Sequence, residues 1–258
     1  MDNQELNTFQ SFFFGIGEKF RFVGRIFIES FFLHVEWREF IRQCFQVGVR
    51  TLPIITFTAF IAGFVFTKQS LPTLEEFGAD AWLPKVASIG IVRALGPLIA
   101  AIICSGKLGS AIGAELSSMA VSEQIDAMEI SGTNPFRFLA VTRVAAVTIM
   151  LPLLVIYSDA ISLFGSFLLV TITSQTSLDI YFGEVFDTLR FSDVIISIGK
   201  PIFFGLGIGL VSTYCGYYAE RNTSGVGRAS NTAVVASIVT VFILDLLFVQ
   251  IQNLIIPK

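Results

Sequence analysis

Five long apolar stretches constrain the fold of this sequence more than any other feature. They cover residues 47–69, 83–105, 141–172, 193–215 and 233–256. Each meets or exceeds the ~20 helical residues that cross about 30 Å of bilayer hydrocarbon. Because a segment inside hydrocarbon has to satisfy its own backbone hydrogen bonds, each stretch predicts a helix. We therefore expect an all-α integral membrane protein with five transmembrane helices.

The composition agrees with a membrane protein and argues against several functional classes. Of the 258 residues, 53% are apolar and 14% are charged, compared with about 25% charged residues in ordinary soluble domains. The net charge of −3 does not favour a nucleic-acid partner. The sequence has no GxxxxGK(S/T), HExxH or GxSxG motif and no His/Asp/Glu cluster. We therefore expect no catalytic residue, no metal site and no cofactor, and the chain is not predicted to be an enzyme.

The N-terminal region, residues 8–46, mixes aromatic and charged side chains, and none of its 18-residue windows is free of charge. This pattern predicts an amphipathic helix in the membrane interface, where basic side chains reach phosphate groups. A re-entrant segment or an additional span is the alternative. Residues 1–258 are then one domain, in which this interfacial region precedes a five-span core over residues 47–256.

The distribution of Lys and Arg predicts the orientation, because cytoplasmic segments carry an excess of these residues. We expect a cytoplasmic N-terminus and a C-terminus on the outer side. The inside segments then contain Lys19, Arg21, Arg25, Arg38, Arg42, Lys107, Arg137, Arg221 and Arg228. The outside loops contain only Arg190, with Lys68 and Lys85 at their edges and Lys258 at the terminus. This orientation places residues 106–140 in the cytoplasm.

A long polar segment, residues 107–135, separates the second and third apolar stretches. Small residues recur at helical spacing around its beginning, which allows two helices to approach closely. They are Ser105, Gly106, Gly109, Ser110 and Gly113. Packing within one chain and contact between two copies both fit this pattern.

Residues 121–131 of the polar segment are predicted to form a short acidic helix. Ser122 is its candidate cap, and acidic residues in the first turns favour the positive end of the helix dipole. Ile125 and Met128 lie on one side, and Gly132 ends the helix. Such a helix either docks into a groove on a soluble partner or only connects two spans. The candidate docking residues are Glu123, Gln124, Ile125, Asp126, Met128 and Glu129.

Three runs of residues occur in a specific order and spacing: 93–97 (RALGP), 105–116 (SGKLGSAIGAEL) and 122–128 (SEQIDAM). Further matches are Gly63, Gln69, Asn134-Pro135, Arg143, Lys200, Gly216-Tyr217, Gly225-Val226-Gly227 and Asp245. From about residue 40 to its end, the chain resembles the MlaE/YrbE family. Members of that family are permease subunits of ABC systems that work with MCE proteins on lipids.

The resemblance implies an assembly and a substrate. Family members dimerise at the centre of an inner-membrane complex, so a second copy of the chain is an expected partner. Two cytoplasmic ABC ATPase subunits bind from below and hydrolyse ATP, and a ring of MCE-domain subunits lies above. The expected substrate is phospholipid or a related lipid, moved between the inner and outer membranes. Residues 121–131 correspond to the coupling helix seated in the ATPase, and the N-terminal region corresponds to the family's interfacial helix.

A lipid path needs an apolar wall for the tails and a polar contact for the head group. The candidates are Phe64, Phe66, Thr67 and Gln69 at the outer end of the first span, with Arg93 in the second. Arg93 is the candidate phosphate contact, and a structural ion pair is the alternative.

Three positions depart from the family pattern. Ala94 replaces an acidic residue that the family often has near the lipid cavity, so the role of that acid is not carried over. Lys107 replaces an arginine, which keeps the charge but loses the bidentate fork. Ser70-Leu71 replaces a more usual glycine–aromatic pair.

A stand-alone secondary transporter or channel without an ATPase partner is the competing class. Such a protein needs polar residues at mid-membrane in several spans, whereas few charges interrupt the apolar stretches here. Asp159 and Asp245 are isolated acids within spans and are therefore functional candidates. Pairing with Arg143 or Lys200 would give them a structural role instead.

Overall fold

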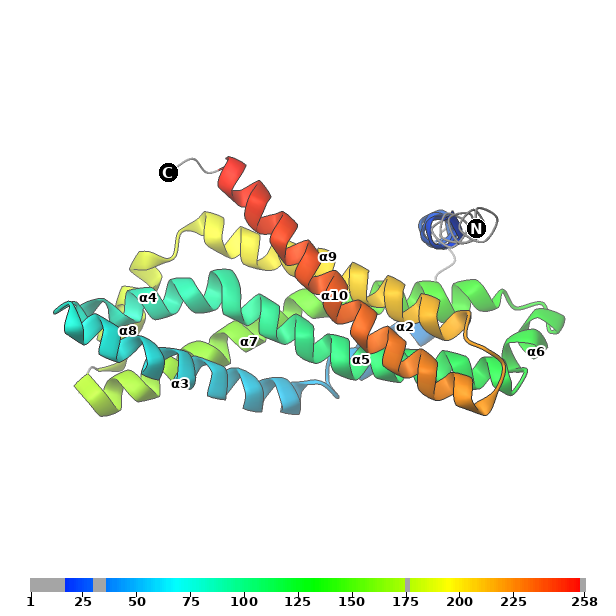
Figure 1. The fold of residues 1–258 in the computed structure, drawn as a ribbon, viewed down its shortest axis with the longest axis horizontal. Helices are drawn as coiled ribbons and strands as arrows, with labels where there is room; N and C mark the ends of the chain where they lie inside the picture. Colours follow the sequence, from blue (N-terminus) through cyan, green and yellow to red (C-terminus); the bar gives the residue numbers. More distant parts are fainter. Residues whose placement is uncertain (1–16, 30–35, 175–176, 256–258) are drawn as a thin grey trace, which may run out of the picture.

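The computed structural model describes residues 17–29, 36–174 and 177–255, and all regular structure in these ranges is helical (Figure 1). Five helical segments are long and apolar enough to span a membrane: Trp37–Glu76, Asp80–Val121, Phe136–Thr173, Ile195–Tyr217 and Thr223–Gln252. The predicted all-α fold with five membrane-spanning segments is therefore confirmed. Of the predicted N-terminal region and fifth span, residues 8–16, 30–35 and 256 lie outside the described ranges.

Short connections join the helices along the chain, and a helical segment over residues 17–29 precedes them. In order they are α2 (Trp37–Val47), α3 (Leu52–Glu76), the 3-10 turn η1 (Asp80–Trp82), α4 (Leu83–Gly90), the π-helical turn η2 (Ile91–Leu95), α5 (Gly96–Val121), α6 (Gln124–Ile130), the π-helical turn η3 (Phe136–Val141), α7 (Thr142–Ser174), α8 (Leu178–Thr188), α9 (Phe191–Tyr217) and α10 (Thr223–Ile255).

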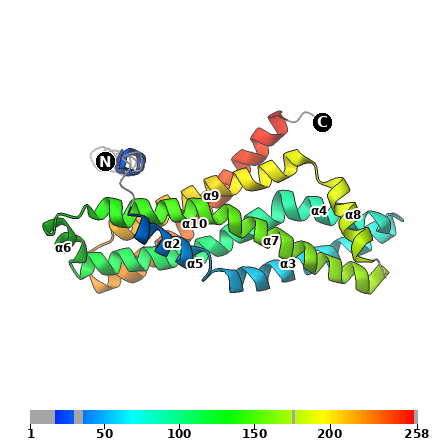
Figure 2. The ribbon, with the colours of Figure 1, turned by 180° about the vertical axis from the view of Figure 1, so that it is seen from behind.

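The long helices run along the length of the molecule, with α7 in the middle of the bundle (Figures 1 and 2). α7 packs against α2, α3, α5 and α9, and 67% of the most apolar stretch of its span is buried. α6 lies at one end of the bundle, and α8 lies at the other end near the α3–α4 connection. The bundle therefore has two distinct ends, each carrying a short helix.

Two spanning helices extend beyond the predicted apolar stretches. α5 continues to Val121 instead of ending near residue 105, and α10 begins at Thr223 instead of near residue 233. The 33 residues of α10 measure about 50 Å at 1.5 Å per residue, which exceeds the ~30 Å of hydrocarbon. α8 lies between the third and fourth apolar stretches, where no helix is predicted. The predicted boundaries are wrong because hydropathy detects only the part of a helix that lies in hydrocarbon.

Small residues of α5 bring this helix against α10. A Cβ atom on Gly113 would lie 3.1 Å from a backbone oxygen of α10, and one on Gly109 would lie 3.4 Å from a backbone carbon. The hydroxyls of Ser110 and Ser230 are 3.0 Å apart. These three positions of the predicted stripe therefore pack within the chain. A Cβ on Gly106 would meet nothing within 4 Å in the described part of the chain.

α3 and α7 approach each other at two glycines. A Cβ atom on Gly63 would lie 1.9 Å from the carbonyl oxygen of Ser162, and one on Gly165 would lie 2.4 Å from that of Phe60. Ser162 Oγ also donates a 2.9 Å hydrogen bond to the carbonyl oxygen of Ala59. The two backbones are therefore in direct contact, a geometry that only small residues allow in membrane helix pairs.

α9 carries polar side chains at steps of four and three residues, Asp193, Ser197 and Lys200, which places them on one face. Ser197 Oγ donates a 3.0 Å hydrogen bond to Asp159 of α7. Lys200 forms a 2.5 Å ion pair with Asp245 of α10. This polar face therefore joins α9 to two neighbouring spans. Asp193, the first residue of the face, contacts Arg93 of η2.

The isolated acids within the spans thus have local partners. Asp245 pairs with Lys200, one of the two basic residues given as alternative structural partners. Arg143, which is 2% exposed, pairs instead with Glu115 of α5 at 2.9 Å. A polar group inside a span is costly unless it has such a partner, so these contacts stabilise the arrangement of α5, α7, α9 and α10.

The helix over residues 17–29 lies crosswise to the bundle, toward the end that carries α6. Figures 1 and 2 view this helix end-on, whereas the long helices run across the picture. Its Phe22 and Ile26 are buried in a cluster with Phe136, and the Arg25 guanidinium lies 4.2 Å from the centre of the Phe136 ring. Large apolar side chains of the same helix remain exposed: Phe20, Phe27 and Ile28.

A methyl group added at Gly63 is expected to destabilise the protein by about 1–3 kcal/mol, because it forces the α3 and α7 backbones apart. Gly199→Ala is the matched control, since a Cβ at this position of α9 would meet no described atom within 4 Å. Thermal unfolding in detergent compares the two variants. Equal melting temperatures for Gly63→Ala and Gly199→Ala would contradict the close contact.

Lys200→Met removes one partner of the α9–α10 ion pair and leaves Asp245 in apolar surroundings. We expect this variant to lose on the order of 3 kcal/mol of stability. The double variant Lys200→Met/Asp245→Leu removes both charges and is expected to recover most of the loss. A double-mutant cycle of unfolding free energies measures the coupling, and a double variant as unstable as the single one would refute it.

Candidate functional site

A sharp reversal of the chain at one end of the bundle sets α6 between α5 and η3. Glu123 has φ = +56°, a left-handed conformation that costs a residue with a side chain about 1–2 kcal/mol. Gly132 ends α6 with φ = +81°, as predicted, because glycine adopts this conformation readily. Asn134 Oδ1 then accepts hydrogen bonds of 3.1 and 3.3 Å from two backbone N–H groups of η3. The predicted Ser122 cap is wrong, since its hydroxyl donates to the carbonyl oxygen of Ser118.

One apolar and one ionic contact fix α6 to the bundle. Ile125 is buried in the main core cluster, and Met128 packs against that cluster. Asp126 accepts two hydrogen bonds, of 2.7 and 3.0 Å, from the guanidinium of Arg221 in the α9–α10 connection. The bonds to the Asp126 carboxylate raise the pKa of Arg221 above its ordinary value. α6 is therefore held between the core and the connection that follows α9.

The outward side of α6 is formed mainly by residues that do not anchor it. Glu123, Gln124, Ala127 and Glu129 are exposed, and Ile130 is 89% exposed. Ile130 is absent from the predicted docking residues. The sequence signal for it is a large apolar residue directly before the turn that ends the helix.

The predicted lipid-path residues of α3 lie in different environments. Phe64 stacks on a phenylalanine one turn earlier, with 6.5 Å between ring centres. Thr67 is fully buried and forms a 2.7 Å hydrogen bond with Ser166 of α7. Phe66 and Gln69 line a cavity of about 300 Å³ between α3 and α4. Phe66 and Gln69 therefore share a cavity, which Arg93 does not line.

Arg93 lies on η2, the π-helical turn that joins α4 to α5. Its Nη2 atom is 2.7 Å from Oδ1 of Asp193, which is 1% exposed, while the Arg93 side chain is 36% exposed. Asp193 also accepts a 3.0 Å hydrogen bond from the backbone N–H of Arg190 and so caps the start of α9. The structural ion pair is therefore present, and about a third of the Arg93 side chain remains exposed.

The glycine of the RALGP run makes room for a carboxylate. A Cβ atom on Gly96 would lie 1.6 Å from Oδ1 of Asp159, which is 8% exposed. This acid is therefore enclosed between η2, α5, α7 and α9. Within the described ranges, His, Cys, Asp and Glu side chains form no group of three or more that could hold a metal ion.

Comparisons with known proteins agree on a membrane permease. The model of the permease family MlaE matches residues 40–251. A probable ABC transporter permease protein of Rickettsia typhi is 34% identical, over 81% of this chain and 81% of the relative. Another from Pyropia yezoensis is 34% identical, over 87% and 86%. The chloroplastic protein trigalactosyldiacylglycerol 1 of Arabidopsis thaliana is 30% identical, over 82% of this chain and 60% of the relative. The chain therefore belongs to the MlaE permease family.

Proposed function

We propose that this protein is the membrane-spanning subunit of an ABC transporter that moves phospholipid or a related lipid. The observation that carries the proposal is α6, an acidic helix that is anchored to the end of a five-span bundle and turned outward. The names of the relatives from Rickettsia typhi and Pyropia yezoensis support an ABC system. The Arabidopsis relative is named after a galactolipid, which supports a lipid as the substrate.

α6 is the proposed docking element for the ATPase subunit. Ile125 and Met128 seat the helix on the bundle, whereas the exposed Ile130, among acidic neighbours, provides an apolar anchor for a groove on the partner. The ion pair between Asp126 and Arg221 fixes the angle at which this surface is presented. A force on α6 therefore acts on α5, α7 and the α9–α10 connection at once.

The proposed path of the force leads from α6 along α5 to η2. α5 runs without interruption from Gly96 to Val121, so a displacement of α6 reaches the π-helical turn that holds Arg93. Two copies of the chain would enclose the lipid chamber between them. Phe66 and Gln69 are the candidate contacts for the lipid at the α3–α4 side, and Arg93 is the candidate contact for its phosphate.

The same arrangement supports an orientation in the inner membrane. If α6 meets a cytosolic ATPase, its end of the bundle is cytoplasmic and the end with α8 is periplasmic, where an MCE-domain partner would bind. The crosswise helix over residues 17–29 then lies at the cytoplasmic interface, with exposed apolar residues toward lipid. The N-terminus is cytoplasmic and the C-terminus is periplasmic in this arrangement.

Ile130→Lys is expected to abolish co-purification of the ATPase subunit without lowering the melting temperature of the permease, because the side chain is 89% exposed. Ile180→Lys is the matched control, since it places the same charge on an isoleucine of α8, 60% exposed, at the opposite end. Affinity purification of the complex from membranes measures both. Equal recovery of the ATPase with the two variants would exclude α6 as its docking surface.

The double variant Arg93→Gln/Asp193→Asn removes the cation and its buried partner together. Crosslinking to a photoactivatable phospholipid is expected to fall about tenfold, because a charged hydrogen bond to phosphate contributes about 1.5–3 kcal/mol. Asp193→Asn alone keeps the guanidinium and is expected to retain crosslinking. A yield that is unchanged in the double variant would remove Arg93 from the lipid path.

A further inference from the structure

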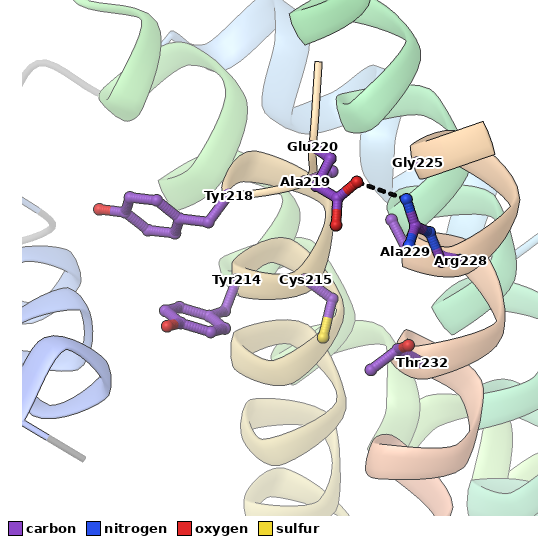
Figure 3. A pocket seen from close by; sticks show the side chains of 9 residues that line it. All are labelled: Tyr214, Cys215, Tyr218, Ala219, Glu220, Gly225, Arg228, Ala229 and Thr232. Atoms are coloured by element: carbon purple, nitrogen blue, oxygen red, sulfur yellow. Dashed lines mark hydrogen bonds and ion pairs between the residues drawn. The ribbon is translucent and has the colours of Figure 1, made fainter. Parts of the chain in front are cut away.

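A pocket with charged residues in its lining lies between the facing ends of α9 and α10, at the end of the bundle that carries α6. Its volume is about 360 Å³. Figure 3 shows Cys215 of α9 and Thr232 of α10 directed into the gap between the two helices. Arg228 and Glu220 form an ion pair at the outer limit of this gap. The pocket therefore has a charged rim and a less polar floor.

An apolar groove of about 540 Å³ continues from this pocket along the two helices. The pocket and the groove share Tyr214, Cys215 and Thr232. The groove walls come from Leu210 of α9, Val239 of α10 and the helix over residues 17–29. A charged rim that opens into a long apolar groove has the polarity of a lipid, with its head group at one end and its acyl chain at the other.

The helix over residues 17–29 closes the third side of the groove. The ring of Phe22 packs edge-on against Tyr214 and Tyr218, with 5.4 and 5.8 Å between ring centres. Both tyrosine rings point away from Arg228 in Figure 3. Lys19 of this helix lines the groove and adds a second positive charge beside it. The groove is therefore bounded by α9, α10 and the helix over residues 17–29, and it is open along its remaining side.

The length of the groove fits one leaflet of a membrane. Arg228 and Thr240 lie about 18 Å apart along α10 at 1.5 Å per residue. Half of the ~30 Å hydrocarbon thickness is about 15 Å. An acyl chain that starts at the rim would thus reach the middle of the bilayer. The helix over residues 17–29 lies toward the same end of the bundle as the charged rim of the pocket.

The geometry points to a second lipid site, which binds one glycerophospholipid between α9, α10 and the helix over residues 17–29. The phosphate contacts Arg228, with Lys19 as the second cation, and one acyl chain lies along Ala236 and Val239. Arg228 and Lys19 are the cations that line the pocket and the groove, and Glu220 is the carboxylate that the phosphate would displace from Arg228. Glu18 also acts on Tyr214 of the groove, so the phosphate contact rests on Arg228 and not on an excess of positive charge. This site is separate from the proposed lipid path at Arg93 and does not depend on the ATPase.

The full-length protein in phosphatidylcholine nanodiscs, doped with phosphatidylglycerol that carries a diazirine in its acyl chain, tests this site. Photolysis followed by peptide mapping is expected to label the groove segments of α9 and α10. Ala236→Trp fills the groove and is expected to reduce this labelling to background. Val235→Trp, on a side chain 55% exposed one residue earlier, is the matched control and is expected to keep it. Equal labelling of the two variants would mean general lipid contact and would overturn the proposal.

The head-group contact is tested by two variants that break the same ion pair. Arg228→Ala is expected to lower labelling about tenfold, because it removes the charged contact to phosphate. Glu220→Ala leaves the cation in place and is expected to keep or increase labelling. An equal loss in both variants would assign only a structural role to the pair and would overturn the phosphate contact.

Two further measurements separate this site from alternatives. Soluble glycerol 3-phosphate is expected not to compete with the probe, since the acyl chain provides the binding in the groove, and full competition would contradict a lipid site. Gln69→Ala, in the α3–α4 cavity of the proposed lipid path, is expected to leave the α9–α10 labelling unchanged. A loss of labelling in this variant would mean that the groove is not an independent site.

Discussion

The hydrocarbon of a bilayer does not solvate polar groups, so polar side chains within a span need partners inside the protein. In this bundle the polar face of α9 provides several such pairs. A charge at the centre of a membrane costs at least ~2.5 kcal/mol unless it has a partner. Asp193, Ser197 and Lys200 each meet a polar group on a different neighbouring element. These pairs fix the rotation of α9 about its axis, because turning the helix would separate all three contacts at once. Apolar packing alone would not specify this rotation, since lipid tails are as apolar as the side chains.

Small residues determine which helices move together. The glycines between α3 and α7 bring the two backbones into contact, and Gly109 and Gly113 seat α5 on α10. Interiors packed this closely transmit displacement. The protein therefore consists of two closely joined helix pairs, with α9 in contact with members of both. In the proposed transporter, α6 acts on one of these pairs through α5.

The sequence predicts the number of spans, the existence of α6 and the glycine that ends it. Each of these depends on residues that are close together in the sequence. The extent of α5 and α10 could not be predicted, since their polar ends lie outside the apolar pattern and pack on each other at Gly109 and Gly113. The structural ion pair given as the alternative for Arg93 is present, but its partner could not be identified, because Asp193 lies 100 residues away in the sequence. Thr67 was expected on the lipid path and is enclosed against α7. α3 is apolar on nearly all sides, so its pattern does not indicate which side faces the bundle.

The two π-helical turns, η2 before α5 and η3 before α7, have a consequence for how the bundle changes shape. A π turn contains one surplus residue compared with an α-helix. If the π turn shifts along the helix by one position, one residue rotates by about 100° about the helix axis. The helical turns on either side stay where they are. Arg93 lies within such a turn. Such a shift at η2 would redirect the guanidinium of Arg93 without any tilt of a whole membrane helix.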